Sequence, residues 1–301
     1  MLAADPYPVL DVTRWDRSGD EAMGTKEKFW CADPDGERHL FKFARPGTGE
    51  GWAEKIAAEL GRSLGVPCAE VELALCDGRP GSLSRSFVVE GRHVLVHGNE
   101  LLQSIDTSYP MHQLRGVSPH TVDAVLQLLE SVGPGPAPVP SLATGADVFV
   151  GYLLLDALIT NGDRHHENWG VLQLSGGARD LAPSYDHASS LGRELTDGER
   201  QGRLATSDFQ YQPTAYHRRA RSAFFAIGGQ KPLHPIAAFA RAAKLRPAAG
   251  KLWLARLATL GEDELDVLLQ RAPSSAMSGP ANHFARKLIE LSRNQLLSLV
   301  P

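Results

Sequence analysis

The sequence is poor in cysteine, has no long apolar run and carries no excess of basic residues. Its three cysteines, Cys31, Cys68 and Cys76, are an odd number without CxxC spacing, which argues against a disulfide framework or a zinc knuckle and predicts reduced thiols. No apolar run approaches the roughly 18 residues that span a bilayer, and the first residues lack the basic and apolar regions of a secretory leader. The formal net charge of -4 leaves no basic footprint for nucleic acid. We therefore expect a soluble cytoplasmic protein without a membrane or direct nucleic-acid partner.

The first hundred residues have the pattern of a small sheet with one helix. Alternating residues on both sides of the turn at 33–36 predict a hairpin, and the stretches 69–76, 83–90 and 93–98 are also typical of strands. Between them, residues 52–65 place Ile56, Leu60 and Leu64 on one face of a helix that stops at a glycine. We expect residues 1–98 to form a lobe of sheet plus helix.

After residue 100 the pattern becomes mainly helical, with a break at the Pro- and Gly-rich stretch 133–141. The predicted helices lie at 121–132, 146–160, 235–245, 253–260, 263–272 and 282–300. With 301 residues and 43% hydrophobic content, the chain can bury one large core or two lobes. The prediction is an α+β fold with a sheet-plus-helix lobe followed by a helical lobe over 99–301.

The stretch NGDRHHENWG, 161–170, places charged and polar residues between an apolar helix and a predicted strand. Asp163 and Asn168 are separated by four residues, and Asp186 follows beyond the return strand of a hairpin. This arrangement is typical of kinase phosphoryl transfer, where the first Asp accepts the proton of the acceptor hydroxyl, while the Asn and the second Asp hold magnesium. Magnesium prefers such hard oxygen ligands and is shared with the phosphates of the nucleotide.

A kinase also needs a cation that holds the phosphates and a helix carboxylate that orients this cation. Lys42 lies inside the predicted strand HLFKF, where a lysine among apolar residues is unusual without a partner. Glu54 lies near the start of the helix that follows, close to the face that carries the small residues Ala57 and Ala58. We predict an ion pair between Lys42 and Glu54.

The chain resembles the HipA-like serine/threonine kinases in six stretches between about residues 24 and 190. They are GTKEK, LFKF, WAEKIAAELGRSLGVP, LSRSF, NGDRHHENWG and LAPSYD. The resemblance implies an atypical protein-kinase fold, ATP and Mg²⁺ as cofactors, and transfer of phosphate to a protein Ser or Thr. It also implies a toxin or regulatory role, with an aminoacyl-tRNA synthetase among the known kinds of target and an antitoxin as partner.

The same resemblance suggests further nucleotide contacts. The loop from Gly24 to Lys28 would cover the phosphates, and His165 would lie beside them, with His166 at the surface. The stretch 93–102, with Val96 and His97, is expected between the lobes, where it would contact adenine through its backbone.

Two departures from the family pattern bear on regulation. Only about 23 residues precede GTKEK, so we expect the additional N-terminal subdomain of HipA toxins to be missing. The family's phosphate loop carries a serine that the kinase phosphorylates in itself, and Glu21 stands at this position. Glu21 either abolishes this self-inhibition or imitates part of the phosphoserine charge, which is about -1.5 to -2.

Other functions stay open at this point. GDRHHEN also resembles the loop of phosphoinositide kinases, so a lipid or small-molecule kinase is an alternative, although LAPSYD replaces their DFG-type segment. A catalytically silent, kinase-like nucleotide sensor is another. The basic cluster HRRARSAF, 217–224, either faces an acidic or phosphorylated partner or is a solvated helix face.

Overall fold

The hairpin predicted around residues 33–36 supplies two neighbouring strands of a six-stranded sheet. In the computed structural model, which describes residues 5–20, 27–135 and 140–299, β3 (Lys28–Ala32) and β4 (Arg38–Phe43) pair antiparallel, and Gly36 turns between them at a φ of 82°. The sheet has the order β1-β5-β6-β4-β3-β2. Its other strands are β1 (Val9–Asp11), β2 (Asp16–Asp20), β5 (Val71–Cys76) and β6 (Arg79–Arg85).

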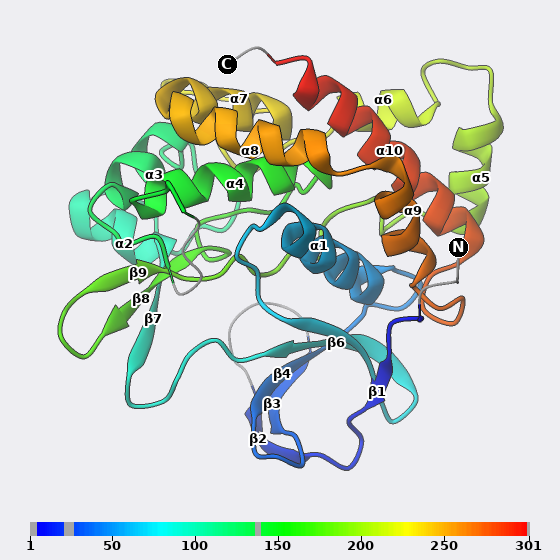
Figure 1. Ribbon diagram of the computed structural model, residues 1–301, viewed down its shortest axis with the longest axis horizontal. Coiled ribbons are helices and arrows are strands. Elements are labelled where there is room, and N and C mark those ends of the chain that lie inside the picture. The colour runs from blue at the N-terminus through cyan, green and yellow to red at the C-terminus, as the bar shows by residue number, and fades with distance from the viewer. Residues whose placement is uncertain (1–4, 21–26, 136–139, 300–301) are drawn as a thin grey trace.

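Helix α1 (Glu50–Leu64) lies between this sheet and the helices of the second part of the chain (Figure 1). It ends at Gly65 in the left-handed conformation, as the sequence predicts. The helix approaches the sheet closely, because a Cβ on Gly51 would lie 2.9 Å from the carbonyl oxygen of Gly81 in β6. Buried apolar residues such as Ile56 and Leu60 join α1 to the large core. We call the six-stranded sheet with α1 the small lobe.

A second sheet of three strands starts what we call the helical lobe. Strand β7 (His93–His97) pairs with β8 (Gly170–Leu174), which pairs with β9 (Arg179–Leu181), all antiparallel. The predicted strand at 93–98 therefore exists but joins a strand from beyond residue 99 rather than the first sheet. The division of the chain at 98/99 stays a prediction.

The helical lobe is built around α4 (Gly145–Leu158), where every residue but Asp147 is buried. A helix that is apolar on all sides needs neighbours on all sides, and α3, α7, α8 and α10 pack against it (Figure 1). Besides α4, the helices of this lobe are α2 (Gly98–Ile105), α3 (Val122–Leu129), α5 (Asp197–Ala205), α6 (Pro213–Arg218), α7 (Pro235–Leu245), α8 (Pro247–Thr259), α9 (Glu262–Gln270) and α10 (Gly279–Leu297).

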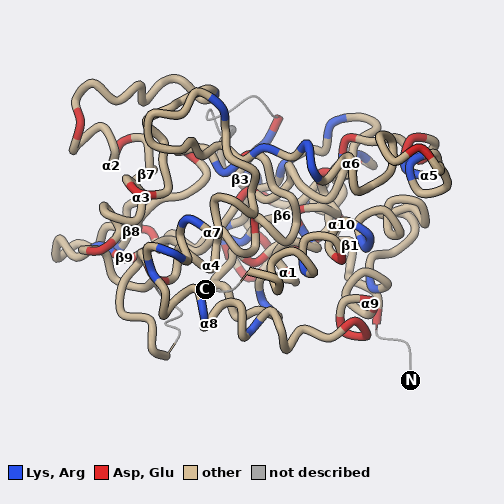
Figure 2. Tube along the Cα trace, turned by 90° about the horizontal axis from the view of Figure 1, so that it is seen from above, with Lys and Arg blue, Asp and Glu red and all other residues tan. Residues whose placement is uncertain are grey.

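Charged residues of both signs are scattered over both lobes rather than gathered by sign (Figure 2). Within the described ranges, none of the helices combines the length and the apolar character that crossing a membrane requires. The three cysteines are free thiols, as predicted, and Cys31 and Cys76 are buried in the small lobe.

Buried histidines, among them His120 and His217, make the stability of the fold dependent on pH. Burial lowers the pKa of His120 to about 3 and that of His217, which lies 3.0 Å from the hydroxyl of Ser292, to about 4. In the unfolded chain both pKa values are about 6.5. Below pH 6.5 the unfolded chain therefore binds protons that the folded chain does not, so the stability present above pH 6.5 is lost as the pH falls.

We expect the melting temperature to fall between pH 6.5 and pH 5, with each histidine lowering the free energy of unfolding by about 1–2 kcal/mol over this interval. Thermal melts at half-unit pH steps measure this. His217→Gln, which can still bond to Ser292, should make the slope shallower. An equally steep slope in this variant would show that His217 does not carry the effect.

Candidate active site

The loop between α4 and β8 is held by a buried ion pair. Arg164 is 1% exposed, and two of its nitrogens donate to the two carboxylate oxygens of Asp156, at 2.8 and 2.7 Å. Its third nitrogen donates to the backbone carbonyls of Asn168, at 2.9 Å, and Tyr185, at 3.2 Å. Arg164 therefore fixes the position of Asn168 relative to the segment that carries Asp186.

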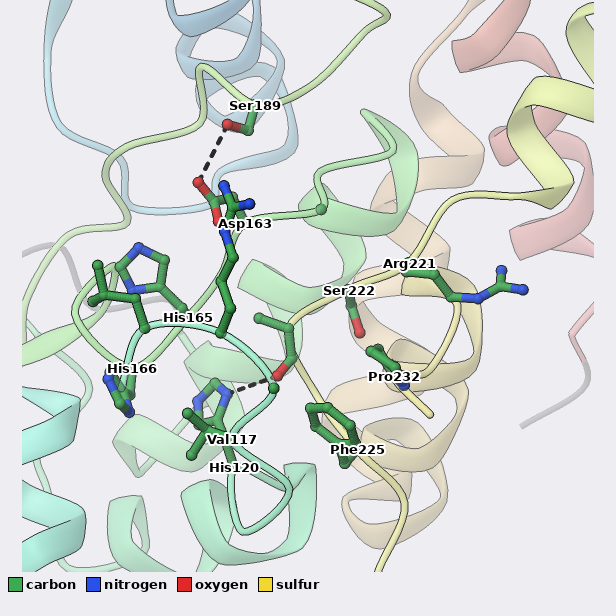
Figure 3. A pocket seen from close by; sticks show the side chains of 15 residues that line it. Val117, His120, Asp163, His165, His166, Ser189, Arg221, Ser222, Phe225 and Pro232 are labelled. Atoms are coloured by element: carbon green, nitrogen blue, oxygen red, sulfur yellow. Dashed lines mark hydrogen bonds between the residues drawn. The ribbon is translucent and has the colours of Figure 1, made fainter. Parts of the chain in front are cut away.

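Asp163 and Asn168 are joined within this loop. The side-chain nitrogen of Asn168 donates to the backbone carbonyl of Asp163 at 2.7 Å. This leaves the side-chain oxygen of Asn168 as the group that can bind a cation. The backbone N–H of Asp163 donates to the side-chain oxygen of Asn161 at 3.0 Å. Its carboxylate accepts a hydrogen bond of 3.3 Å from Ser189, drawn as a dashed line in Figure 3.

Asp186 lies beside the predicted cation of the small lobe. Its backbone has a φ of 57°, a left-handed conformation that non-glycine residues rarely adopt outside functional sites and tight turns. The ammonium of Lys42 lies 3.2 Å from Oδ2 of Asp186. Burial lowers the pKa of Lys42, but the negative charges of Asp186 and Glu54 outweigh this and hold the pKa above its ordinary value.

The predicted ion pair between Lys42 and Glu54 is wrong, because Lys42 pairs with Asp186 instead. Glu54 accepts a hydrogen bond of 2.8 Å from the backbone N–H of His187, and Nδ1 of that histidine lies 3.3 Å from the same oxygen. The partner of the Glu54 carboxylate is therefore His187 rather than Lys42. Burial raises the pKa of Glu54, but the hydrogen bond from His187 and the charges of His187 and Lys42 more than offset this, so the pKa lies below its ordinary value.

The two adjacent histidines of the loop have different surroundings. His166, predicted at the surface, is completely buried, and its Nδ1 lies 2.9 Å from the hydroxyl of Tyr109. Its backbone carbonyl also accepts from the backbone N–H of Asn99 in α2 at 2.9 Å, so this residue joins the loop to α2. Burial lowers its pKa to about 4, which keeps the imidazole neutral. His165 is half-buried and faces a cavity beside Asp163 (Figure 3).

The predicted adenine-contacting stretch lies next to the loop between α4 and β8. We call this loop the catalytic loop, after the role that the sequence predicts for it. Val96 pairs with Val171 in the second sheet. Nδ1 of His97 lies 2.9 Å from the carbonyl of Glu167 and 3.0 Å from the hydroxyl of Tyr185. The structure thus brings this stretch to the loop, while its contact with a nucleotide stays a prediction. Gly24 and Glu21 lie outside the described residues.

A chain of contacts that the sequence did not indicate links Asp163 to the first turn of α1. Ser189, which donates to Asp163, lies 3.4 Å from a nitrogen of Arg193. Another nitrogen of Arg193 donates to Glu50 at 2.6 Å, and Glu50 is 3% exposed. The backbone N–H of Gly49 also donates to the carbonyl of Arg193 at 2.8 Å. The small lobe and the catalytic loop therefore share one polar network.

A cavity of about 350 Å³ opens on one side of Asp163. Its walls include Val117 and His120, His165 and His166, and the segment from Arg221 to Ala223 (Figure 3). Lys42, Asn168 and Asp186 do not line it. Asp163 thus lines the cavity and is at the same time hydrogen-bonded to Asn168, which does not line it.

The donor set fits a hard divalent cation with a nucleotide. Asp186 offers a carboxylate and Asn168 an amide oxygen, and both types are ligands that Mg²⁺ accepts together with phosphate oxygens. Oε2 of Glu54 is buried without a hydrogen-bond partner among the described residues, so a negative oxygen is available near Lys42. Lys42, which lies beside Asp186, would hold phosphate oxygens of the nucleotide.

A family model described as the HipA-like C-terminal domain matches residues 21–247. Among solved structures, the proinflammatory kinase CtkA of Helicobacter pylori is similar, with a TM-score of 0.77 and 18% identity over 97% of this chain and 100% of that one. HipA of Shewanella oneidensis MR-1, solved in a toxin–antitoxin complex with HipB and operator DNA, has a TM-score of 0.56 and 15% identity over 98% and 70%. No curated protein sequence matches the chain. These likenesses confirm the predicted two-lobed, kinase-like α+β fold.

Proposed function

The chain belongs to the family of HipA-like C-terminal domains, and we propose that it is an ATP- and Mg²⁺-dependent kinase that phosphorylates serine or threonine in a protein. One observation carries the proposal. The catalytic loop holds Asp163 and Asn168 together through a hydrogen bond of 2.7 Å, and Asp186 lies 3.2 Å from the lysine of the small lobe. These are the residue types that phosphoryl transfer requires around the two substrates.

Each residue has a role that follows from its position. The carboxylate of Asp163 orients the acceptor hydroxyl and accepts its proton, as far as transfer requires one. Asn168 and Asp186 would hold Mg²⁺, which when bound neutralises charge on the β- and γ-phosphates. Lys42 holds phosphate oxygens, and the charge of Glu54 keeps Lys42 protonated. The protein thus acts mainly by positioning its substrates and stabilising charge.

The proposal extends to the parts of the chain that bind the nucleotide. Residues 1–98 would form the nucleotide-covering lobe and 99–301 the lobe with the catalytic loop. Gly24, Val96, His97 and His165 are the further residues proposed at the nucleotide. A regulatory or toxin role with an antitoxin-type partner is proposed from the family alone, with the complex of HipA and HipB as its support.

Phosphoryl transfer should require a divalent metal and Asp186. We expect the purified protein, incubated with γ-labelled ATP and a lysate, to label discrete protein bands with Mg²⁺ and none after chelation by EDTA. Asp186→Asn should also label none, because an amide cannot neutralise the metal as a carboxylate does. Asp263→Asn, the same change at an exposed position on α9, serves as the control and should label like the wild type.

The outcome separates the alternatives. Labelling that persists in EDTA would contradict metal-assisted transfer. Labelling of lipid or small molecules without protein bands would indicate another kind of kinase. If ATP raises the melting temperature but no acceptor is labelled, the chain is a nucleotide sensor rather than a kinase.

A further inference from the structure

The cavity is lined by Asp163 but by none of the residues proposed to hold the metal and the phosphates. In a kinase the acceptor hydroxyl and the nucleotide meet at the catalytic Asp from opposite sides, because attack and departure are roughly in line. Asp163 lines the cavity, whereas none of Lys42, Asn168 and Asp186, the residues proposed for the metal and the phosphates, does. Its volume of about 350 Å³ is at the lower end of small-molecule pockets, which run from roughly 300 to 1,000 Å³. This is room for a few side chains of an acceptor segment.

The charge of the cavity walls is predominantly positive. Among the described residues that line the cavity, Asp163 is the one with a carboxylate, and two, Arg115 and Arg221, carry a positive charge. Arg115 is exposed, and its guanidinium has no hydrogen bond or ion pair with the described part of the chain; only its carbonyl is engaged, by Gln113. Arg221 donates to the carbonyls of Ala220, at 2.7 Å, and Arg218, at 3.3 Å, and no acid among the described residues pairs with its charge.

Arg221 belongs to the basic cluster 217–224, for which the sequence left two interpretations open. Only the start of the cluster belongs to a helix, with Arg218 exposed at the end of α6. Beyond the helix, Arg221, Ser222 and Ala223 form one wall of the cavity. In Figure 3 the guanidinium of Arg221 extends outward at the rim, away from the other labelled side chains. A rim charge acts over the roughly 8 Å of the Debye length at physiological salt, so it biases which charges approach the cavity.

We propose that this cavity is the acceptor pocket and that it selects protein segments in which a serine or threonine is adjacent to acidic residues. The proposal rests on the kinase function proposed above. Val117, Phe225 and Pro232 give the cavity an apolar wall that fits the methylene groups of a glutamate, while Arg115 meets its carboxylate. The overall charge of -4 makes this pocket a local exception, so acidic substrates are attracted here rather than to the whole surface.

The test is an oriented peptide library with a central serine or threonine and Glu, Gln or Lys at each neighbouring position, phosphorylated with Mg²⁺ and labelled ATP. The wild type should prefer Glu over Lys by roughly tenfold or more at one or more positions, and less so at high salt. The variant Arg115→Glu/Arg221→Glu should invert this preference. The control, Arg92→Glu/Arg179→Glu, makes the same change of charge at exposed arginines outside the cavity and should keep the preference for Glu.

The other outcomes are distinguishable. If the wild type phosphorylates peptides without a preference for Glu, or if the cavity variant keeps that preference, the pocket proposal is wrong and the kinase stands. Labelling of RNA but of no peptide, in a parallel reaction with RNA in place of the library, would overturn it in favour of a nucleic-acid acceptor. If no peptide, RNA or lysate protein is labelled, the kinase function itself fails, and the acceptor pocket fails with it.

Discussion

Asp163→Asn is expected to lower the rate of phosphoryl transfer by roughly 10²–10⁴-fold, the usual contribution of a positioned acid–base group. Asparagine has nearly the same shape, and the backbone N–H and carbonyl of residue 163 keep their bonds to Asn161 and Asn168. The variant loses only the carboxylate that orients the acceptor hydroxyl. Single-turnover kinetics with an acceptor identified from the lysate, together with the Kd for ATP, measure the two effects separately.

The matched control for this prediction is Glu167→Gln, the same chemical change in the same loop, at a residue that contributes its backbone carbonyl to the contacts with His97 and Tyr185. It should transfer phosphate at nearly the wild-type rate. A fall in ATP affinity in Asp163→Asn as large as the fall in rate would show that Asp163 acts on the nucleotide side, contrary to the role proposed for it.

Arg164→Met should lower the free energy of unfolding by about 3–5 kcal/mol, because it leaves the carboxylate of Asp156 buried without its cation. The backbone carbonyls of Asn168 and Tyr185 lose a donor at the same time. Urea denaturation of wild type and variant at pH 7 measures the difference. A loss below 1 kcal/mol would mean that water reaches Asp156 and that the pair is not sealed in the core.

A double variant separates the two roles of Arg164. Asp156→Leu/Arg164→Met replaces both charges by apolar groups and should recover most of the lost stability, as buried pairs replaced in this way often do. Its rate of phosphoryl transfer should remain low, because neither residue now ties Asn168 to the segment of Asp186. Full recovery of both stability and rate would show that the pair is not needed to position the loop.

Much of this fold can be predicted from periodicity. The helices around α1, α4, α7 and α10 have long apolar repeats, and the hairpin of β3 and β4 has a turn of Asp, Pro and Gly. Short or polar elements were missed: α5 buries one arginine, Arg200, and β2 has the sequence DRSGD. Such segments form because the rest of the chain positions them, so they have no local pattern from which to predict them.

The sequence alone indicates the site only where the residue types and their spacing are typical of a reaction. Asp163 and Asn168 share a hydrogen bond, and Arg164 ties the carbonyl of Asn168 to that of Tyr185, the neighbour of Asp186. The partner of Lys42, by contrast, depended on His187, which the topology brings to Glu54. One further signal was present in the sequence. Asp156 is a carboxylate near the end of an otherwise apolar helix, which predicts a buried partner and leads to Arg164.

The burial of α4 among other helices also determines which parts of the protein can unfold locally. Because helices pack around it on several sides, its backbone amides cannot reach water while the helical lobe keeps its core. Their exchange with deuterium then occurs only through complete unfolding of that lobe, and their rates report its full stability. Asp156 lies in the last turn of α4, so the anchor of the catalytic loop belongs to the last part of the chain to exchange. Strands at the edge of the small lobe can therefore unfold and refold locally while the ion pair that holds the catalytic loop stays intact.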